Sequence, residues 1–235
     1  MEEEDWYCRI EDNLAGVLNA IWTPDSRQII TFSDFQLKAT IYNLSTKTQS
    51  IFRNPKYIDK GYGFSHNGKF LALAERREGK DYVGIYFIGD WKLLNFFQTD
   101  TFDLADLVWS PDDAVIAVWD TILEYKLLIY CPATGLLAKF QPYESALGLK
   151  SLQFSENSQF LALGSFDEKV RLLNTLTWKL ITEFEFKAPE GLVYFQEELD
   201  LDAGGYKNPN KPTKFILKVS ILKFFTAKHL YILLK

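Results

Sequence analysis

The chain has 235 residues, of which 47% are hydrophobic and 16% aromatic, enough apolar material for a sizeable core. Its formal net charge is −5 with no block of basic residues, which argues against binding to a nucleic-acid backbone. No run of about eighteen apolar residues occurs, and acidic residues follow Met1, so we expect neither a membrane span nor a signal peptide. The composition favours a soluble, intracellular protein.

The first predicted unit covers residues 16–53 and holds four short runs rich in β-branched and aromatic residues. Such runs predict strands with at least one buried face. Asn54 and Pro55 end the unit, because proline cannot donate a hydrogen bond to a sheet. The runs are residues 17–22, 28–32, 38–42 and 48–52, and residues 6–10 before them predict the closing strand of another unit.

Three further units follow at residues 58–98, 103–141 and 146–186. Every unit contains an aromatic residue followed by serine or threonine, and the four aromatic anchors are residues 22, 64, 109 and 154. Four-stranded units repeating every 40–45 residues or so are typical of WD-type β-propeller blades. We therefore expect an all-β fold in which residues 1–186 form part of a WD40-type propeller. Four blades make an incomplete ring, since rings of this type use about seven.

After residue 186 the repeat stops, and residues 187–235 form a divergent tail. Residues 204–213 have the composition of a linker, and residues 214–235 alternate apolar clusters with lysines. Three interpretations of the tail stay open. It is a basic amphipathic helix for a membrane surface or a partner, a further pair of strands, or a disordered segment.

Candidate catalytic groups are few. The two histidines, His66 and His229, are far apart in the sequence, no Cys/His grouping has zinc-ligand spacing, and no glycine-rich phosphate loop follows a strand. Paired acids occur at 112–113 and at 120 and 124, but carboxylates in blade turns commonly hold backbone amides. We expect a non-enzymatic protein without cofactor, metal or small-molecule substrate, in which Asp167 has a structural role in a turn of the fourth unit.

Loops held by a rigid scaffold commonly carry binding function. The loops between the second and third strands of neighbouring blades should emerge on one rim, which places residues 75–82 beside residues 120–125. Arginines and aromatic residues are frequent in binding hot spots. The predicted partner-binding residues are Arg76, Arg77, Lys80, Tyr82, Trp119 and Tyr125. Burial in the core is the alternative for Trp119 and Tyr125, and we place Trp22 and Trp109 in the core.

The Arg76–Arg77 pair also suggests an alternative function. Guanidinium groups bind phosphate in a bidentate manner, so the pair could recruit the propeller to membranes through phosphoinositides. Glu75 and Glu78 flank the arginines and reduce the local positive charge. A solvated, ion-paired loop and a contact with another protein are the competing interpretations.

Three stretches resemble one conserved eukaryotic family. They are LALAERREGKDYVGIY, AVWDTILEYKLLIY and SLQFSENSQFLALGSFDEKVRLLNTLTWKLITEF. The family is that of the WD repeat-containing protein encoded antisense to the p-seventy-three tumour-protein gene, and the resemblance covers about residues 6–184. It implies a non-enzymatic cytoplasmic scaffold at the centrosome, centriolar satellites and spindle poles. It also implies a coiled-coil partner that anchors microtubule minus ends, and roles in spindle assembly and cilium formation.

Overall fold

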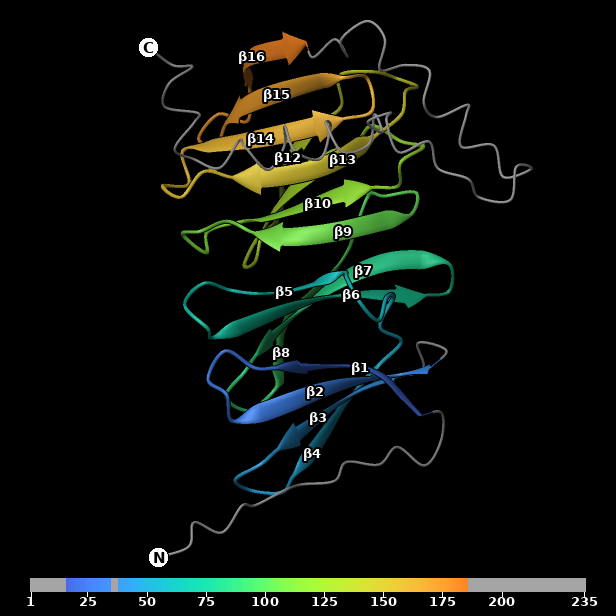
Figure 1. The fold of residues 1–235 in the computed structure, drawn as a ribbon, viewed down its shortest axis with the longest axis vertical. Helices are drawn as coiled ribbons and strands as arrows, with labels where there is room; N and C mark the ends of the chain where they lie inside the picture. The colour runs from blue at the N-terminus through green and yellow to red at the C-terminus, as the bar shows by residue number, and fades with distance from the viewer. Residues whose placement is uncertain (1–15, 35–37, 186–235) are drawn as a thin grey trace, which may run out of the picture. The chain divides into compact units, whose positions relative to one another are not determined.

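A computed structural model describes residues 16–34 and 38–185, which fall into two compact units divided between Ala146 and Leu147. The strand predicted at residues 6–10 and the tail lie outside the described residues. Among the described residues, the first unit contains three four-stranded antiparallel sheets and the second contains one (Figure 1). The first sheet consists of β1 (Val17–Trp22), β2 (Gln28–Ser33), β3 (Lys38–Asn43) and β4 (Gln49–Arg53).

The other three sheets repeat this layout. The second sheet consists of β5 (Tyr62–Phe64), β6 (Phe70–Arg77), β7 (Lys80–Phe87) and β8 (Lys92–Gln98). The third consists of β9 (Leu104–Trp109), β10 (Ile116–Asp120), β11 (Leu127–Cys131) and β12 (Gly135–Phe140). The fourth consists of β13 (Leu149–Phe154), β14 (Phe160–Ser165), β15 (Lys169–Asn174) and β16 (Leu180–Glu185).

In every sheet the strands lie side by side in chain order, so each sheet is a simple meander (Figure 1). The prediction of an all-β fold built from four four-stranded units is confirmed. The predicted loop at residues 75–82 is wrong. Six of its residues extend β6 and β7, and only Glu78 and Gly79 form the turn between them.

The serine or threonine after each aromatic anchor organises the turn between the first two strands. In the third sheet the Ser110 hydroxyl donates to Asp112 Oδ1 (2.5 Å) and accepts from the Val115 amide (3.0 Å). The amide of the fourth turn residue donates to the carbonyl of the first, and that fourth residue has a positive φ. The same bonds recur in all four sheets, at Thr23, Ser65, Ser110 and Ser155. The repeated sequence motif, an aromatic residue followed by serine or threonine, therefore marks a repeated turn in the structure.

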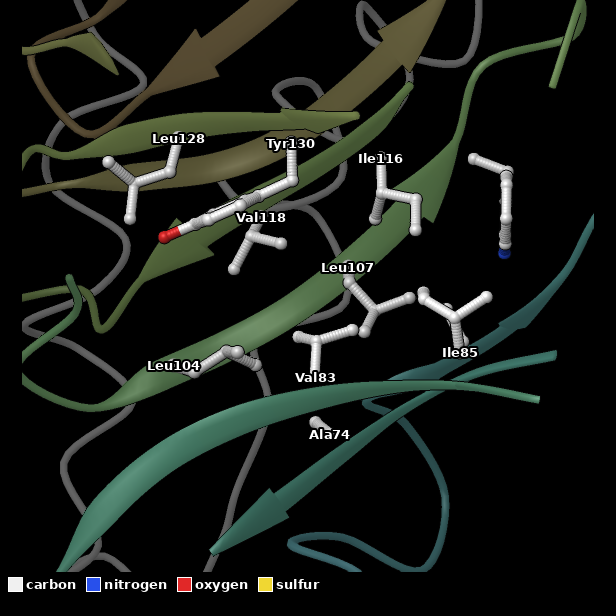
Figure 2. Close-up of a cluster of buried hydrophobic side chains, with 11 residues drawn as sticks. Ala74, Val83, Ile85, Leu104, Leu107, Ile116, Val118, Leu128 and Tyr130 are labelled. Carbon is white, nitrogen blue, oxygen red and sulfur yellow. The ribbon is translucent and has the colours of Figure 1, made fainter. Parts of the chain in front are cut away.

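Two apolar clusters hold the three sheets of the first unit together. One contains Phe32 and Phe52 of the first sheet with Leu71 and Tyr86 of the second. The other joins the second and third sheets, and Figure 2 shows its side chains meeting between them. Its labelled members are Ala74, Val83, Ile85, Leu104, Leu107, Ile116, Val118, Leu128 and Tyr130. Each of these three sheets thus buries a face against its neighbour, and the second sheet buries both of its faces, as blades of a repeat protein do.

The two tryptophans placed in the core have different environments. Trp109 is buried and its indole nitrogen donates to the Gly63 carbonyl across the sheet interface (2.8 Å). Trp22 is 56% exposed, so its assignment to the core is wrong. Ile21, its neighbour on β1, packs toward the second sheet. Because strand side chains alternate, Trp22 lies on the other face of the first sheet.

Candidate functional site

The two predicted arginines next to the turn between β6 and β7 are adjacent in the sequence, but their side chains do not lie together. Arg76 and Arg77 are successive residues of β6, so their side chains point to opposite faces of the sheet. The Arg76 guanidinium lies 2.5 Å from Asp103 Oδ1, in the segment that leads into the third sheet. The Arg77 guanidinium lies 2.5 Å from Glu75 Oε2 and 4.4 Å from the centre of the Phe96 ring. A single phosphate group between the two arginines is therefore not favoured.

Glu75 fixes the position of Arg77. Its side chain is almost fully buried, and Oε2 accepts hydrogen bonds from Arg77 Nε and Nη2. The other oxygen, Oε1, accepts a hydrogen bond from the Tyr86 hydroxyl (2.5 Å). Burial, followed by this hydrogen bond to the carboxylate, raises the pKa of Tyr86. The Tyr86 hydroxyl therefore stays protonated and keeps donating to Glu75.

Arg77, Phe96 and Tyr82 form a layered surface on one face of the second sheet. The Tyr82 and Phe96 rings stack with centres 5.0 Å apart and an angle of 8° between their planes. The arginine lies over the same Phe96 ring, in a cation–π contact. Lys80, at the start of β7, is exposed at the end of this hairpin. We call Arg77, Lys80, Tyr82 and Phe96 the hairpin surface.

A second charged group lies on the opposite face of the same hairpin. Lys56 is buried, and its Nζ contacts Asp81 Oδ2, Asp103 Oδ1 and the Leu104 carbonyl, each at 2.7 Å. Asp81 also accepts the Leu104 amide at 2.6 Å, which connects the second sheet to the start of β9. Burial opposes ionisation of Asp103, but Lys56 and Arg76 outweigh it and hold the pKa of Asp103 below its usual value. These contacts join two sheets and contribute to stability.

Tyr125 does not belong to a partner-binding surface. Its side chain is 1% exposed and contacts the rings of Phe140 and Tyr143 edge-on, so the prediction that it binds a partner is corrected. Trp119 is half-buried on β10, next to Val118, which packs toward the second sheet. Alternation along the strand turns Trp119 to the other face, away from the hairpin surface.

Of the predicted partner-binding residues, Arg77, Lys80 and Tyr82 lie together on the hairpin surface. The sequence analysis did not identify Phe96 and Glu75 as part of this site.

Comparison with known proteins places these sheets in a family. No protein-family model matches the chain. The WD repeat-containing protein WRAP73 of Mus musculus is 46% identical to it over 202 residues, which cover 84% of this chain and 44% of the mouse protein. The chain is a WD-repeat protein similar to WRAP73. An uncharacterised WD repeat-containing protein of Schizosaccharomyces pombe is 25% identical over 204 residues, or 85% of this chain and 41% of that protein. The chain thus spans less than half the length of either curated relative.

One acid of each predicted pair in this WD-repeat chain binds backbone amides. The Asp120 carboxylate accepts the amides of Phe102 (2.7 Å) and Asp103 (2.8 Å), just before β9. Asp113 accepts the amides of His66 (2.6 Å) and Asn67 (2.8 Å), in the neighbouring sheet. Within residues 16–34 and 38–185, no three His, Cys, Asp or Glu side chains gather in a way that could hold a metal ion. In the same ranges no helix is long and apolar enough to span a membrane.

The fourth sheet carries its own ion-paired turn. Asp167 lies between β14 and β15, accepts the Lys169 amide at 3.2 Å and contacts the Ser165 hydroxyl. Its other oxygen lies 2.6 Å from Nη2 of Arg171, a buried arginine. Arg171 also places Nε 2.8 Å from Glu183 Oε2 on β16. The carboxylates therefore hold a buried guanidinium in addition to the turn.

Proposed function

We propose that this chain is a non-enzymatic scaffold that binds another protein through the hairpin surface. The observation that carries the proposal is the Arg77 guanidinium, held over the Phe96 ring by the buried Glu75. An arginine already fixed in place loses little conformational entropy on binding. Arginines and aromatic side chains also dominate the energetics of protein interfaces. The WD-repeat relatives support a scaffold of blades that presents such a surface.

The cellular setting is part of the same proposal. The resemblance of the three sequence stretches supports a location at the centrosome, centriolar satellites and spindle poles. The proposed partner is a coiled-coil protein that anchors microtubule minus ends, and the proposed roles are spindle assembly and cilium formation. Acidic side chains are common on the outer positions of coiled coils, and they would complement Arg77 and Lys80.

The first test is recruitment in cells. We expect the tagged chain carrying Arg77→Gln and Lys80→Glu to lose its centrosomal and spindle-pole signal, because the partner loses two cationic contacts. Arg76 is left unchanged, since an acidic residue there would face Asp103, and glutamine is chosen at position 77 because its amide retains an N–H donor for the buried Glu75. The measurement is the tagged protein's fluorescence at a centrosome marker relative to the cytoplasm.

The control is Lys92→Glu, which makes the same charge change as Lys80→Glu on the neighbouring strand β8, at the other end of the sheet. We expect this variant to be recruited normally. Thermal unfolding of all purified variants checks that the fold is retained. Normal recruitment of the folded double variant would exclude the hairpin surface as the docking site.

A further inference from the structure

A pocket of about 440 Å³ opens between the second and third sheets. It lies at the opposite end of the second sheet from the hairpin surface, because Phe70 and Arg77 are the two ends of β6. Aromatic and aliphatic side chains form most of its lining, with one amide and one carboxylate. The lining residues used below are Phe70, Leu94, Asn95, Trp109, Asp113 and Ala133.

The walls of this pocket are fixed by contacts between the two sheets. Trp109 stacks on Phe70 with ring centres 6.4 Å apart, and its indole N–H is bonded to the Gly63 carbonyl. On the other side, Asn95 Nδ2 donates to the Pro132 carbonyl of the third sheet at 2.8 Å. The pocket is therefore formed before any ligand arrives, which favours binding.

Asp113 gives the pocket its electrostatic character, because it is the charged residue of the lining. The His66 and Asn67 amides each donate to one of its oxygens, and His66 Nδ1 lies 3.5 Å from Oδ1. A carboxylate oxygen can accept more than one hydrogen bond, so capacity remains for a cationic ligand. A phosphate or another anion in the pocket would be repelled.

Two exposed aliphatic pairs lie close to the pocket residues in the chain, one on β8, which supplies Leu94, and one on β12, which begins two residues after Ala133. β8 and β12 each contain a β-bulge near their start, where the register to the neighbouring strand shifts by one residue. A bulge disturbs the alternation of side chains, and here two successive aliphatic residues are exposed. The pairs are Leu93 with Leu94 and Leu136 with Leu137, each between 46% and 54% exposed. β4 of the first sheet pairs in regular register and has Gln49 and Ser50 near its start.

We propose that this pocket binds a short segment of another protein in which a bulky apolar side chain adjoins a lysine or arginine. The apolar side chain enters between Phe70, Trp109 and Leu94, and the cation pairs with Asp113. The volume suits one or two side chains, and the exposed leucines contact the flanking residues. The pocket shares no residue with the hairpin surface, so either proposal can fail without the other.

The test begins with a displayed library of random heptapeptides, selected on the full chain. We expect enrichment of sequences that combine Leu, Phe or Trp with an adjacent Lys or Arg. The best peptide is then synthesised with a fluorescent label, and its Kd is measured by anisotropy. Replacing its basic residue by glutamate should weaken binding about tenfold or more, as expected for like charges in a partly buried site. Failure to enrich such sequences, or enrichment of acidic ones, would overturn the proposal.

Three variants of the chain then locate the binding site. Asp113→Asn keeps the positive φ that asparagine tolerates and should remove the preference for the basic peptide over its glutamate version. Ala133→Lys adds a cation at an exposed lining position and should weaken the basic peptide about tenfold or more. Gln49→Lys, on β4 of the first sheet, is the control and should leave the Kd unchanged. Equal affinity for the wild-type chain and Ala133→Lys would place the peptide elsewhere and contradict the proposal.

Discussion

Replacing Lys56 by methionine is expected to lower the free energy of unfolding by about 3 kcal/mol. The substitution keeps an unbranched apolar stem but removes the cation that contacts Asp81, Asp103 and the Leu104 carbonyl. Breaking a buried ion pair from one side commonly costs about 3–5 kcal/mol, because it leaves an uncompensated charge. We expect a loss at the lower end of this range because Arg76 Nη1 remains 3.6 Å from Asp81 Oδ1 and partly compensates its charge. Chemical denaturation followed by tryptophan fluorescence measures the change.

Two further variants separate the charge from the packing. Lys80→Met, on the exposed end of the same hairpin, should change stability by less than about 0.5 kcal/mol. Adding Asp81→Asn to Lys56→Met should recover part of the loss, since it removes the unpaired carboxylate. An unchanged unfolding midpoint for Lys56→Met would show that this group does not join the two sheets as described.

Replacing Asp167 by alanine is expected to cost about 2–4 kcal/mol in the fourth sheet. The variant loses the acceptor of the Lys169 amide and one of two carboxylates around the buried Arg171. A buried cation without its partner is costly, although Glu183 remains 2.8 Å from the guanidinium. Amide hydrogen exchange of β14 and β15 measures the effect in this sheet directly. Glu156→Ala, at an exposed position of the preceding turn, is the control and should leave exchange unchanged.

The effect at Asp167 should also depend on pH. Burial opposes its ionisation, but hydrogen bonds from Arg171 and Ser165 outweigh burial and hold the pKa of Asp167 below its ordinary value of 3.8. A folded-state pKa below the unfolded one stabilises the fold above that ordinary value, and the contribution disappears as pH falls through the folded pKa. The stability difference between wild type and Asp167→Asn should thus be constant at neutral pH and shrink below about pH 4. A stability difference that grows on acidification would contradict the lowered pKa of Asp167.

The repeat could be predicted because its cause is local. The serine or threonine after each aromatic anchor makes the same hydrogen bonds in every sheet, so the motif and its spacing mark each unit. Strand limits followed from β-branched and aromatic runs, which the sheets bury on at least one face. These features depend on residues close together in the chain, which is why composition and spacing were sufficient.

The candidate binding surface could be predicted only in part, because it depends on which face of its sheet each side chain lies on. The charged stretch at residues 75–82 suggested a loop, yet Glu75 is buried by its bonds to Tyr86 and Arg77, partners that the sequence alone does not reveal. Tyr125 and Phe96 are both aromatic residues in apolar contexts, but one is buried and the other lies under an arginine at the surface. Trp22 shares its motif with Trp109, and only the packing of neighbouring sheets distinguishes them.

Affinity purification of the tagged chain followed by mass spectrometry tests the central proposal most directly. Wild type, Arg77→Gln with Lys80→Glu, and the control Lys92→Glu are purified in parallel from dividing cells, and the amounts of co-purified proteins are compared. The proposal predicts a coiled-coil centrosomal protein recovered with wild type and control, and depleted about tenfold or more with the double variant, as for the loss of hot-spot contacts. Recovery of the same proteins in equal amounts by all three, or of no centrosomal protein by wild type, would contradict it.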